Sequence, residues 1–397
     1  MSGAARPAPA ASGWLASAQR RRLLLALACP WSAPGAATTA RADGAASGAD
    51  GVRRGRVLRF PRDHGAHVGS RTEWWYVTAW LGPAEAPSHG VQLTFFRSRT
   101  GLAAALPGRL APRQILFADA AITELGTGAA GGHRHAGRIA RWNGEGAVPG
   151  QPQAVGAARD DARVWIGDWQ LRREGEAWRA SARQTVAREP WALHLRLLPT
   201  QPLLLQGDRG FSRKGPQEIH ASHYVSLPQL AAQATLELGR RRIEATGRAW
   251  LDHEWSEALL APEAVGWDWV GINLFDGRAL TAFQLRRTDG SRLWAGGSLR
   301  EGGSVAAQAF APQQVRWTPE RRWSSPATGA DYPTVWRLAT PAGEMRVRAL
   351  LDAQELDARR STGTIYWEGL SELLDARGRR IGLGYLEMTG YAGRLRL

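Results

Sequence analysis

Short runs in which apolar and polar side chains alternate dominate the chain beyond Arg53. Clear examples are the runs at residues 91–97, 163–166, 191–198, 266–274 and 279–286. A period of two, interrupted by Gly, Pro and Asp, is typical of β-strands joined by turns. Only the stretch from Pro228 to Ala234 is compatible with a helical period. The pattern therefore predicts an all-β protein made of many short strands.

One order of residues occurs twice along the chain. An acidic residue and a tryptophan begin a strand, and a Leu-Thr-x-Phe strand and an arginine follow, first from Glu73 and again from Asp268. An internal repeat indicates two related units, and 397 residues are enough for two domains. We expect two related antiparallel β-domains in tandem, either sandwiches or up-and-down barrels, with the boundary at the polar turn that begins at Gly239. The predicted parts are a signal peptide and linker over 1–52, an N-terminal domain over 53–238 and a C-terminal domain over 239–397.

The run from Glu73 to Leu81 is apolar on both faces of the predicted strand. Alternate residues of a strand point to opposite sides, so Trp75 lies on the face of Glu73, and Tyr76 lies on the other. Such a strand must be covered on both sides, as in a barrel wall that lies under a capping segment or packs against a second barrel. A carboxylate in these surroundings needs a partner or has its pKa raised.

The net charge of +15 suggests an acidic partner at first sight. The positive charge is nearly all arginine, with Lys214 as the only lysine, and the arginines are scattered among apolar residues. That distribution is typical of solvent-facing strand positions, so we expect no nucleic-acid partner. The 19 tryptophans supply large apolar surfaces for cores or for a cavity.

The N-terminal region has the pattern of an export signal. Three arginines, Arg20 to Arg22, precede an apolar run from Leu23 to Ala28 that is too short to span a bilayer. Cleavage could follow Ala42, or Cys29 could become a lipid anchor within an imperfect lipobox, and the arginines weakly resemble a twin-arginine signal. The alternative is a disordered basic tail. We expect an exported protein of the periplasm or cell envelope, without an internal disulfide because Cys29 is the only cysteine.

The segment from Gly247 to Ser256 is the densest in groups that carry chemistry. On a strand, Asp252 and Glu254 share one face, and two carboxylates at this spacing can act as acid and base. His253 and Trp255 share the other face, where an imidazole can donate a proton and an indole can stabilise a developing cation. Asp268, in a following strand, could orient His253 or supply another carboxylate. The alternative is structural: the acids satisfy arginines or turn amides, and Trp255 belongs to the core.

The histidines near residue 220 form a second polar cluster. His220 and Tyr224 share a strand face, whereas His223 points the other way, which argues against a metal site made by His220, His223 and His253. The chain has no Gly-x-Ser-x-Gly motif, and the segment from His253 to Glu257 lacks the final histidine of a zinc-protease motif. We therefore expect neither a metal nor another cofactor.

These segments together resemble a known family of AttH-like predicted secreted hydrolases and carotenoid hydratases. The resemblance spans about residues 57–391 and is carried by the segments at 72–78, 92–97, 223–228, 247–256, 266–269, 366–369 and 384–391. It implies two lipocalin-like barrels and an export signal. His253 and Trp255 match the proposed catalytic pair of the hydratases, but Phe283 and Leu285 stand where those enzymes carry Tyr and Asp. The chain is therefore more similar to the AttH branch, which is associated with ABC transport systems.

Three functions follow as alternatives. The first is an envelope protein that binds an apolar lipid or isoprenoid and works with an ABC transporter permease. The second is a hydratase or hydrolase that acts through Asp252, His253, Glu254 and Trp255, with Asp268. The third is a structural envelope domain without a ligand. The predicted ligand-binding residues are Glu73, Trp75, Tyr224, Trp250, Trp267 and Trp269.

Overall fold

The computed structural model describes residues 51–101, 112–126, 132–144, 153–187 and 189–395. Within these ranges the chain forms strands and two short 3-10 turns, η1 (Arg62–His64) and η4 (Pro312–Gln314), and it contains no α-helix. The all-β prediction is confirmed. No helix in the described part of the chain has the length and apolar character needed to cross a membrane. The predicted export signal and Cys29 lie outside the described residues.

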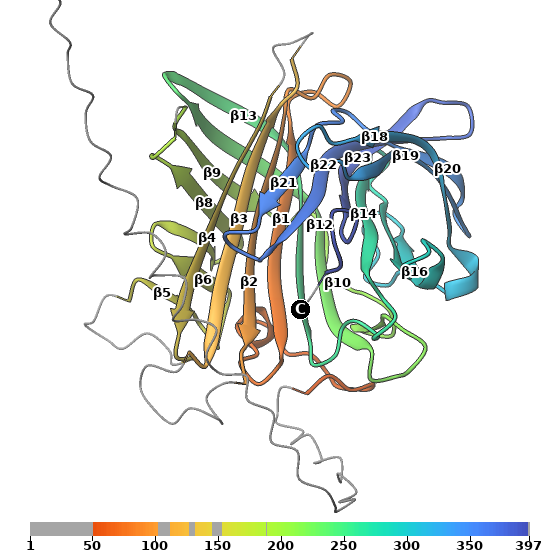
Figure 1. Cartoon of the computed structure of the whole chain (residues 1–397), viewed down its shortest axis with the longest axis horizontal. Coiled ribbons are helices and arrows are strands. Elements are labelled where there is room, and N and C mark those ends of the chain that lie inside the picture. The colour runs from red at the N-terminus through yellow and green to blue at the C-terminus, as the bar shows by residue number, and fades with distance from the viewer. Residues whose placement is uncertain (1–50, 102–111, 127–131, 145–152, 188, 396–397) are drawn as a thin grey trace, which may run out of the picture. The chain divides into compact units, whose positions relative to one another are not determined.

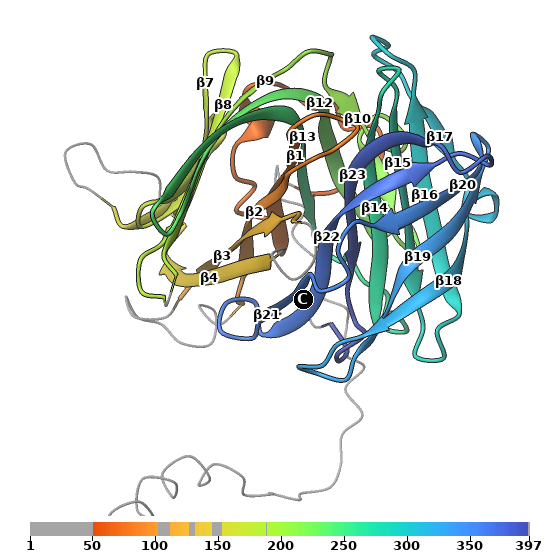
Figure 2. The same cartoon turned by 90° about the horizontal axis from the view of Figure 1, so that it is seen from above.

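The first sheet has 13 strands and curves around one core (Figures 1 and 2). Its order is β4-β3-β2-β1-β13-β12-β9-β8-β7-β6-β5, and β10 and β11 pair with β12. The strands are β1 (Thr72–Leu81), β2 (His89–Arg99), β3 (Gln114–Glu124), β4 (Gly132–Trp142), β5 (Val155–Ala157), β6 (Arg163–Ile166), β7 (Trp169–Glu174), β8 (Ala177–Gln184), β9 (Trp191–Leu198), β10 (Leu204–Leu205), β11 (Phe211–Arg213), β12 (Ala221–Leu238) and β13 (Arg241–Ser256).

The second sheet has ten strands in the order β17-β16-β15-β14-β23-β22-β20-β19-β18, and β21 pairs with β22. The strands are β14 (Gly266–Leu274), β15 (Ala279–Arg286), β16 (Arg292–Arg300), β17 (Gln308–Phe310), β18 (Arg316–Ser324), β19 (Asp331–Thr340), β20 (Gly343–Ala349), β21 (Glu355–Ala358), β22 (Thr364–Leu374) and β23 (Arg380–Met388). Both sheets place their first strand between their second and their last, since β1 lies between β2 and β13 and β14 lies between β15 and β23. This shared order confirms two related barrel-like units.

The two sheets pack against each other through β1 and β13 on one side and β14, β22 and β23 on the other (Figure 2). On β1, Trp75 and Val77 lie in the core of the first barrel, whereas Tyr76 and Trp80 belong to the apolar layer between the sheets. This strand is covered on both faces, as its apolar pattern predicts. Trp250 and Trp269 supply rings to the same layer.

The sheets divide later in the chain than the predicted boundary at Gly239. Gly239 lies in the tight turn between β12 and β13, which are neighbouring strands of the first sheet. The chain passes to the second sheet between Ser256 and Gly266. A polar turn with glycine marks a hairpin tip as readily as a domain border, so local sequence does not distinguish the two.

The helical period between Pro228 and Ala234 is not realised. The stretch lies within β12, where the pairing register with β13 shifts between Leu227 and Leu230. Gln229 adopts φ 58° at this irregularity, as expected of a bulge beside a proline that cannot donate to the ladder. The bulge interrupts the period of two, which explains why the sequence pattern suggested a helix.

Candidate functional site

The predicted catalytic segment, which ends β13, places its side chains alternately on the two faces of the strand. Leu251 belongs to the core of the first barrel, and His253 and Trp255 share its face. Asp252 and Glu254 point the opposite way and line a cavity between the two sheets. The predicted parity of the four residues is confirmed, and the predicted catalytic set is thereby separated into two environments.

Asp252 is buried and accepts three hydrogen bonds. Tyr224 donates its hydroxyl to Oδ2 at 2.7 Å, whereas Ser226 at 2.6 Å and the Trp250 indole at 2.7 Å both donate to Oδ1. Burial raises the pKa of Asp252 to about 7, although these donors oppose the shift. A carboxyl group that titrates near neutrality can take up and release a proton under physiological conditions.

Glu254 forms an ion pair with the only lysine of the chain. The Lys214 ammonium lies 3.0 Å from Glu254 Oε1, and Ser222 donates a short hydrogen bond to the same oxygen. The ammonium also lies 4.5 Å from the ring centre of Tyr224 and 4.2 Å from that of Phe283. This end of the cavity therefore holds a buried ammonium between a carboxylate and two aromatic faces.

The cavity itself has a volume of about 230 Å³. Its walls are mainly aromatic and aliphatic, with half-buried rings at Trp74, Phe96 and Trp267. An apolar space with a few converging polar groups is the usual form of a small-molecule site. The lining residues with polar or charged side chains are Thr72, Glu73, Tyr76, Thr94, Arg97, Ser98, Lys214, Tyr224, Asp252, Glu254, Thr362, Thr364, Tyr366, Glu368, Glu387 and Thr389.

Glu368 and Glu387 form part of the cavity wall contributed by the second sheet. They are direct cross-strand neighbours on β22 and β23. Burial raises the pKa of Glu368 well above its ordinary value and that of Glu387 to about 8, and the repulsion between neighbouring carboxyl groups adds to both shifts. Both groups are therefore mainly protonated near neutral pH.

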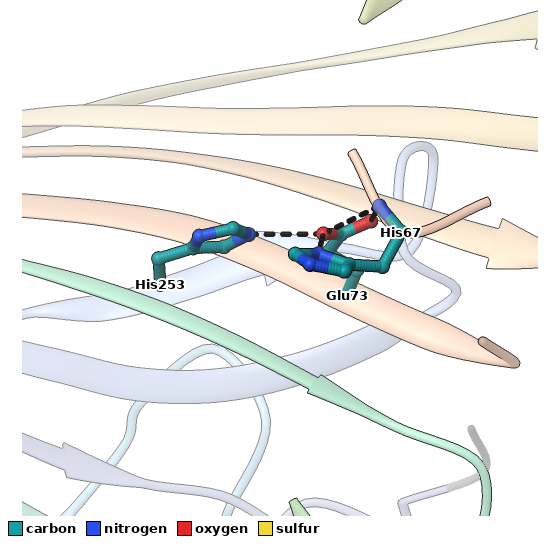
Figure 3. A group of neighbouring side chains, drawn as sticks. All are labelled: His67, Glu73 and His253. Atoms are coloured by element: carbon teal, nitrogen blue, oxygen red, sulfur yellow. Dashed lines mark hydrogen bonds and ion pairs between the residues drawn. The ribbon is translucent and has the colours of Figure 1, made fainter. Parts of the chain in front are cut away.

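The other face of β13 supports a closed cluster inside the first barrel, drawn in Figure 3. His67 Nδ1 at 2.8 Å and His253 Nε2 at 2.9 Å both approach Oε1 of Glu73, and Arg97 donates to Oε2 at 2.8 Å. Burial alone would raise the pKa of Glu73, but Arg97 and the two imidazoles hold it well below its ordinary value. The Trp255 ring stacks on His67 at 3.6 Å between centres.

Three side chains of this cluster, His67, Glu73 and His253, are also placed so that they could hold a metal ion. In the described part of the chain, His67, Glu73 and His253 are the one group of three whose ligand atoms converge, within 4.8 Å of one another. The hydrogen bonds already use these atoms, and the Arg97 guanidinium on the same carboxylate opposes a second cation. The donor set thus fits a hydrogen-bonded cluster better than a metal site. His220, His223 and His253 do not converge.

Asp268 lies in the second barrel, apart from the other predicted catalytic residues. It accepts hydrogen bonds from Gln284 at 2.8 Å, Arg286 at 2.9 Å and the Tyr391 hydroxyl at 2.9 Å. It is fully buried, and its contacts match those of Glu73 with Arg97 in the first barrel. Asp268 therefore neither orients His253 nor shares the environment of Asp252.

The predicted ligand-binding residues are only partly brought together. Glu73, Tyr224, Trp267 and Trp269 contribute to the cavity wall, although the Glu73 carboxylate is engaged by His67, His253 and Arg97. Trp75 lies in the core of the first barrel. Trp250 does not line the cavity, but its indole donates a hydrogen bond to Asp252, which does.

Lys214, Glu368 and Glu387 are among the cavity residues that were not predicted. Glu368 and Glu387 each follow a tyrosine by two positions, a spacing that places an acid and a hydroxyl on one face of a strand. Lys214 is conspicuous as the only lysine in a chain rich in arginine. These signals mark unusual side chains, but they do not reveal that the three share one cavity.

Comparison with known proteins agrees with this architecture. The chain matches the AttH-like family over residues 51–391. A candidate AttH from Nitrosomonas europaea, solved by crystallography, shares 40% sequence identity with this chain. Its structure matches with a TM-score of 0.74 over 86% of this chain and 99% of that chain. Kievitone hydratase from Nectria haematococca has a TM-score of 0.60 over 85% of this chain and 94% of its own, and at 12% identity this likeness shows the fold alone.

The comparison with curated proteins finds no match. The family match covers both sheets and every residue that lines the cavity except Leu395. The solved relatives share the barrel-like arrangement of both sheets, which confirms the lipocalin-like fold expected from the sequence motifs. The chain therefore belongs to the AttH-like family.

Proposed function

We propose that this protein binds an apolar small molecule in the cavity between its two barrels. The observation that carries the proposal is the 230 Å³ space walled by aromatic rings and edged by a few buried polar groups. Apolar cavities of about 150 Å³ can hold a benzene molecule, so this cavity accommodates a larger ligand or the buried end of a long one. Burying the apolar part of such a ligand supplies the main driving force for binding.

Native mass spectrometry of the protein purified from its own cell envelope tests this proposal. We expect a co-purifying molecule that is absent after replacement of Thr364, a half-buried residue of the cavity wall, by tryptophan. Thr318→Trp is the matched control, since Thr318 is also half-buried on a strand but does not line the cavity. Equal ligand loss from both variants, or no ligand in the wild type, would count against the cavity.

A second candidate function is the addition of water to a double bond of the bound molecule. It is favoured by Asp252, whose pKa of about 7 suits both proton donation and proton removal. In such a step an acid group protonates one carbon, the oxygen of water bonds to the other carbon, and a base removes the excess proton from that water. The aromatic walls would stabilise the positive charge that develops between these events. Hydratase activity of a protein with the same fold is consistent with this candidate.

Incorporation of heavy oxygen from labelled water into a lipid extract tests for this chemistry. We expect wild-type protein to yield labelled products and Asp252→Asn to yield none while it still binds ligand. Asp289→Asn is the control, because Asp289 is an exposed turn residue. Label incorporation by Asp252→Asn at the wild-type rate would remove Asp252 from the mechanism.

We also propose that the protein is exported and acts in the cell envelope, on the strength of the arginine and leucine pattern at residues 20–28. The mature protein should begin at or after Cys29, and a lipid on Cys29 would appear as added mass on its N-terminal peptide. A mature protein that still begins near Met1 in the cytoplasm would contradict export. An ABC transporter permease is the partner implied by the sequence resemblance, and co-purification from membranes tests it.

A further inference from the structure

We propose that the ligand is an amphipathic cation, whose ammonium group binds at Glu368 and Glu387 while its apolar body fills the cavity. This inference rests on the proposed ligand-binding function and specifies the chemical class of the ligand. Its basis is the balance of charge in the cavity, the imperfectly paired polar atoms beside Glu368 and the way the protein holds its own ammonium at Lys214.

The charges that line the cavity do not balance. Five acids and two bases belong to its described wall. Glu73 pairs with Arg97, and Glu254 pairs with Lys214. This leaves Asp252, Glu368 and Glu387 without a cationic partner, and buried carboxylates need one or must take up protons. The cavity therefore favours a positively charged ligand and disfavours an anionic one.

Glu368 and Glu387 concentrate this imbalance at one place. Like charges directly opposite each other on neighbouring strands repel, and these two acids are such a pair on β22 and β23. Asp252 and Glu254 on β13 act on Glu387 in the same sense, as Asp119 on β3 acts on Glu368. Bound protons relieve the repulsion in the free protein, and an ammonium group would relieve it by replacing a proton.

Imperfectly paired polar atoms lie beside Glu368. The Tyr76 hydroxyl on β1 faces the Glu368 carboxyl and the Tyr366 hydroxyl faces Gln92, but neither contact has full hydrogen-bond geometry. Tyr76, Tyr366 and Glu368 line the cavity and are at least nine-tenths buried. Buried polar groups with poor hydrogen-bond geometry are destabilising, so they are suited to pairing with the donors of a ligand.

Lys214 shows how this cavity accommodates an ammonium group. Its Nζ contacts one carboxylate, Glu254, one hydroxyl, Ser212 at 3.1 Å, and the faces of two aromatic rings, Tyr224 and Phe283. The wall contributed by the second sheet offers carboxyls from Glu368 and Glu387, and Tyr76 faces Glu368 from β1, but these acids have no cation of the protein beside them. A ligand ammonium at these acids would supply the cationic partner that Lys214 supplies to Glu254.

Isothermal titration calorimetry with three matched probes tests the inference on the full-length protein. Phenylbutylamine, phenylbutanol and phenylbutyrate share one skeleton and differ in the charge of the end group. We expect the amine to bind at least about tenfold more tightly than the alcohol at pH 8, which corresponds to one unit of pKa difference, and the carboxylate to bind weakest. Comparison of buffers with different ionisation enthalpies should show release of about one proton per amine at pH 7, because the ammonium ionises a carboxyl group.

The double variant Glu368→Gln/Glu387→Gln should bind the amine and the alcohol equally within about twofold and release no proton, since the amide side chains keep the shape but cannot ionise. Glu344→Gln is the control, as Glu344 is an exposed strand residue outside the cavity. The wild-type pH dependence gives an independent measure if the double variant fails to fold. Below the Glu387 pKa of about 8, amine affinity should fall about tenfold per pH unit.

The three probes separate failure of this inference from failure of the ligand cavity. If the alcohol binds as tightly as the amine and no proton is released, the cavity binds ligands but not as cations, and the inference is overturned. Preference for the carboxylate overturns it as well. If none of the three probes binds, the proposed cavity function fails together with it.

Discussion

On the inner face of β13, His253 and Trp255 are enclosed by rings and by the Glu73–Arg97 ion pair, whereas on the outer face Asp252 and Glu254 line a cavity. The Glu73 carboxylate, on the inner face, has the Arg97 guanidinium and two imidazoles around it, and these groups lower its pKa. The outer Asp252 has only neutral donors around it, and its pKa is raised. These two buried carboxyl groups, Glu73 and Asp252, lie on neighbouring strands and differ in whether the protein compensates their charge.

This contrast separates structural groups from groups available to a ligand. Both barrels contain the inner arrangement, since Asp268 binds Arg286 in the second as Glu73 binds Arg97 in the first. An ion pair repeated at related places in two barrels is best explained by the folding of each barrel. The uncompensated acids occur where the barrels meet, which is the part of the molecule that duplication of one barrel could not supply.

The largest loss of stability is expected when Arg97, the cation that pairs with Glu73, is removed. Arg97→Ala deprives Glu73 Oε2, Gln114 Oε1 and two backbone carbonyl oxygens of their donor. Breaking a buried pair in this way should lower the free energy of unfolding by about 3–5 kcal/mol, measured by urea denaturation. Arg359→Ala, which removes an exposed ion pair, should leave the free energy of unfolding nearly unchanged. A similar small loss for both variants would show that the inner pair does not anchor the barrel.

The outer acids should respond to pH in the opposite sense from ordinary stabilising carboxylates. Because the pKa of Glu387 is about 8 in the folded protein against 4.5 when unfolded, the stability that this group contributes is complete at low pH and is lost as pH rises through 8. Glu387→Gln is neutral throughout, so it should match the wild type at pH 4 and exceed it at pH 9 by about 2 kcal/mol, a discounted value because the residue is half-buried. Thermal unfolding of both proteins across this range provides the measurement. A constant difference would contradict the assignment.

The sequence predicted the features that depend on local periodicity. The all-β fold, the two related sheets, the covering of both faces of β1 and the division of Asp252 and Glu254 from His253 and Trp255 all follow from a side-chain period of two. The sequence did not predict which face of β13 meets the second sheet, because that depends on how two barrels pack. For the same reason Lys214, Glu368 and Glu387, which come from distant segments, were not assigned to one cavity with Asp252.

Replacing His253 tests directly whether the inner face of β13 stabilises the fold and the outer face binds the ligand. His253→Gln should lower the free energy of unfolding by about 1–3 kcal/mol, because it removes the hydrogen bond to Glu73 and the stacking on Trp75 at 4.8 Å between ring centres. Affinity for a cavity ligand should stay within about twofold, since His253 does not line the cavity. Calorimetry and denaturation on one preparation give both values. Unchanged stability with abolished turnover would restore His253 as a catalytic residue.

The smallest effect on stability is expected at Asp252, although it is buried and accepts three hydrogen bonds. Ser226 and Trp250 both donate to Oδ1, which Asp252→Asn retains as a carbonyl oxygen. Oδ2 accepts only from the Tyr224 hydroxyl, and a hydroxyl can reverse its role and accept from the new amide. Burial and the nearby acids hold the pKa of Tyr224 well above its ordinary value, so it stays a neutral phenol. Its oxygen already accepts from the Trp269 indole at 2.9 Å and has a second lone pair for the new amide.

Every hydrogen bond of Asp252 can therefore survive in Asp252→Asn, and the variant also avoids the cost of a buried charge. We expect its free energy of unfolding at pH 7 to lie within about 1 kcal/mol of the wild type. Proton transfer should nevertheless be lost, because an amide neither releases nor accepts a proton near neutrality. A folded variant that binds ligand without transforming it would identify Asp252 as an acid–base group. A variant that unfolds would instead place Asp252 with Glu73 among the groups that hold the barrels together.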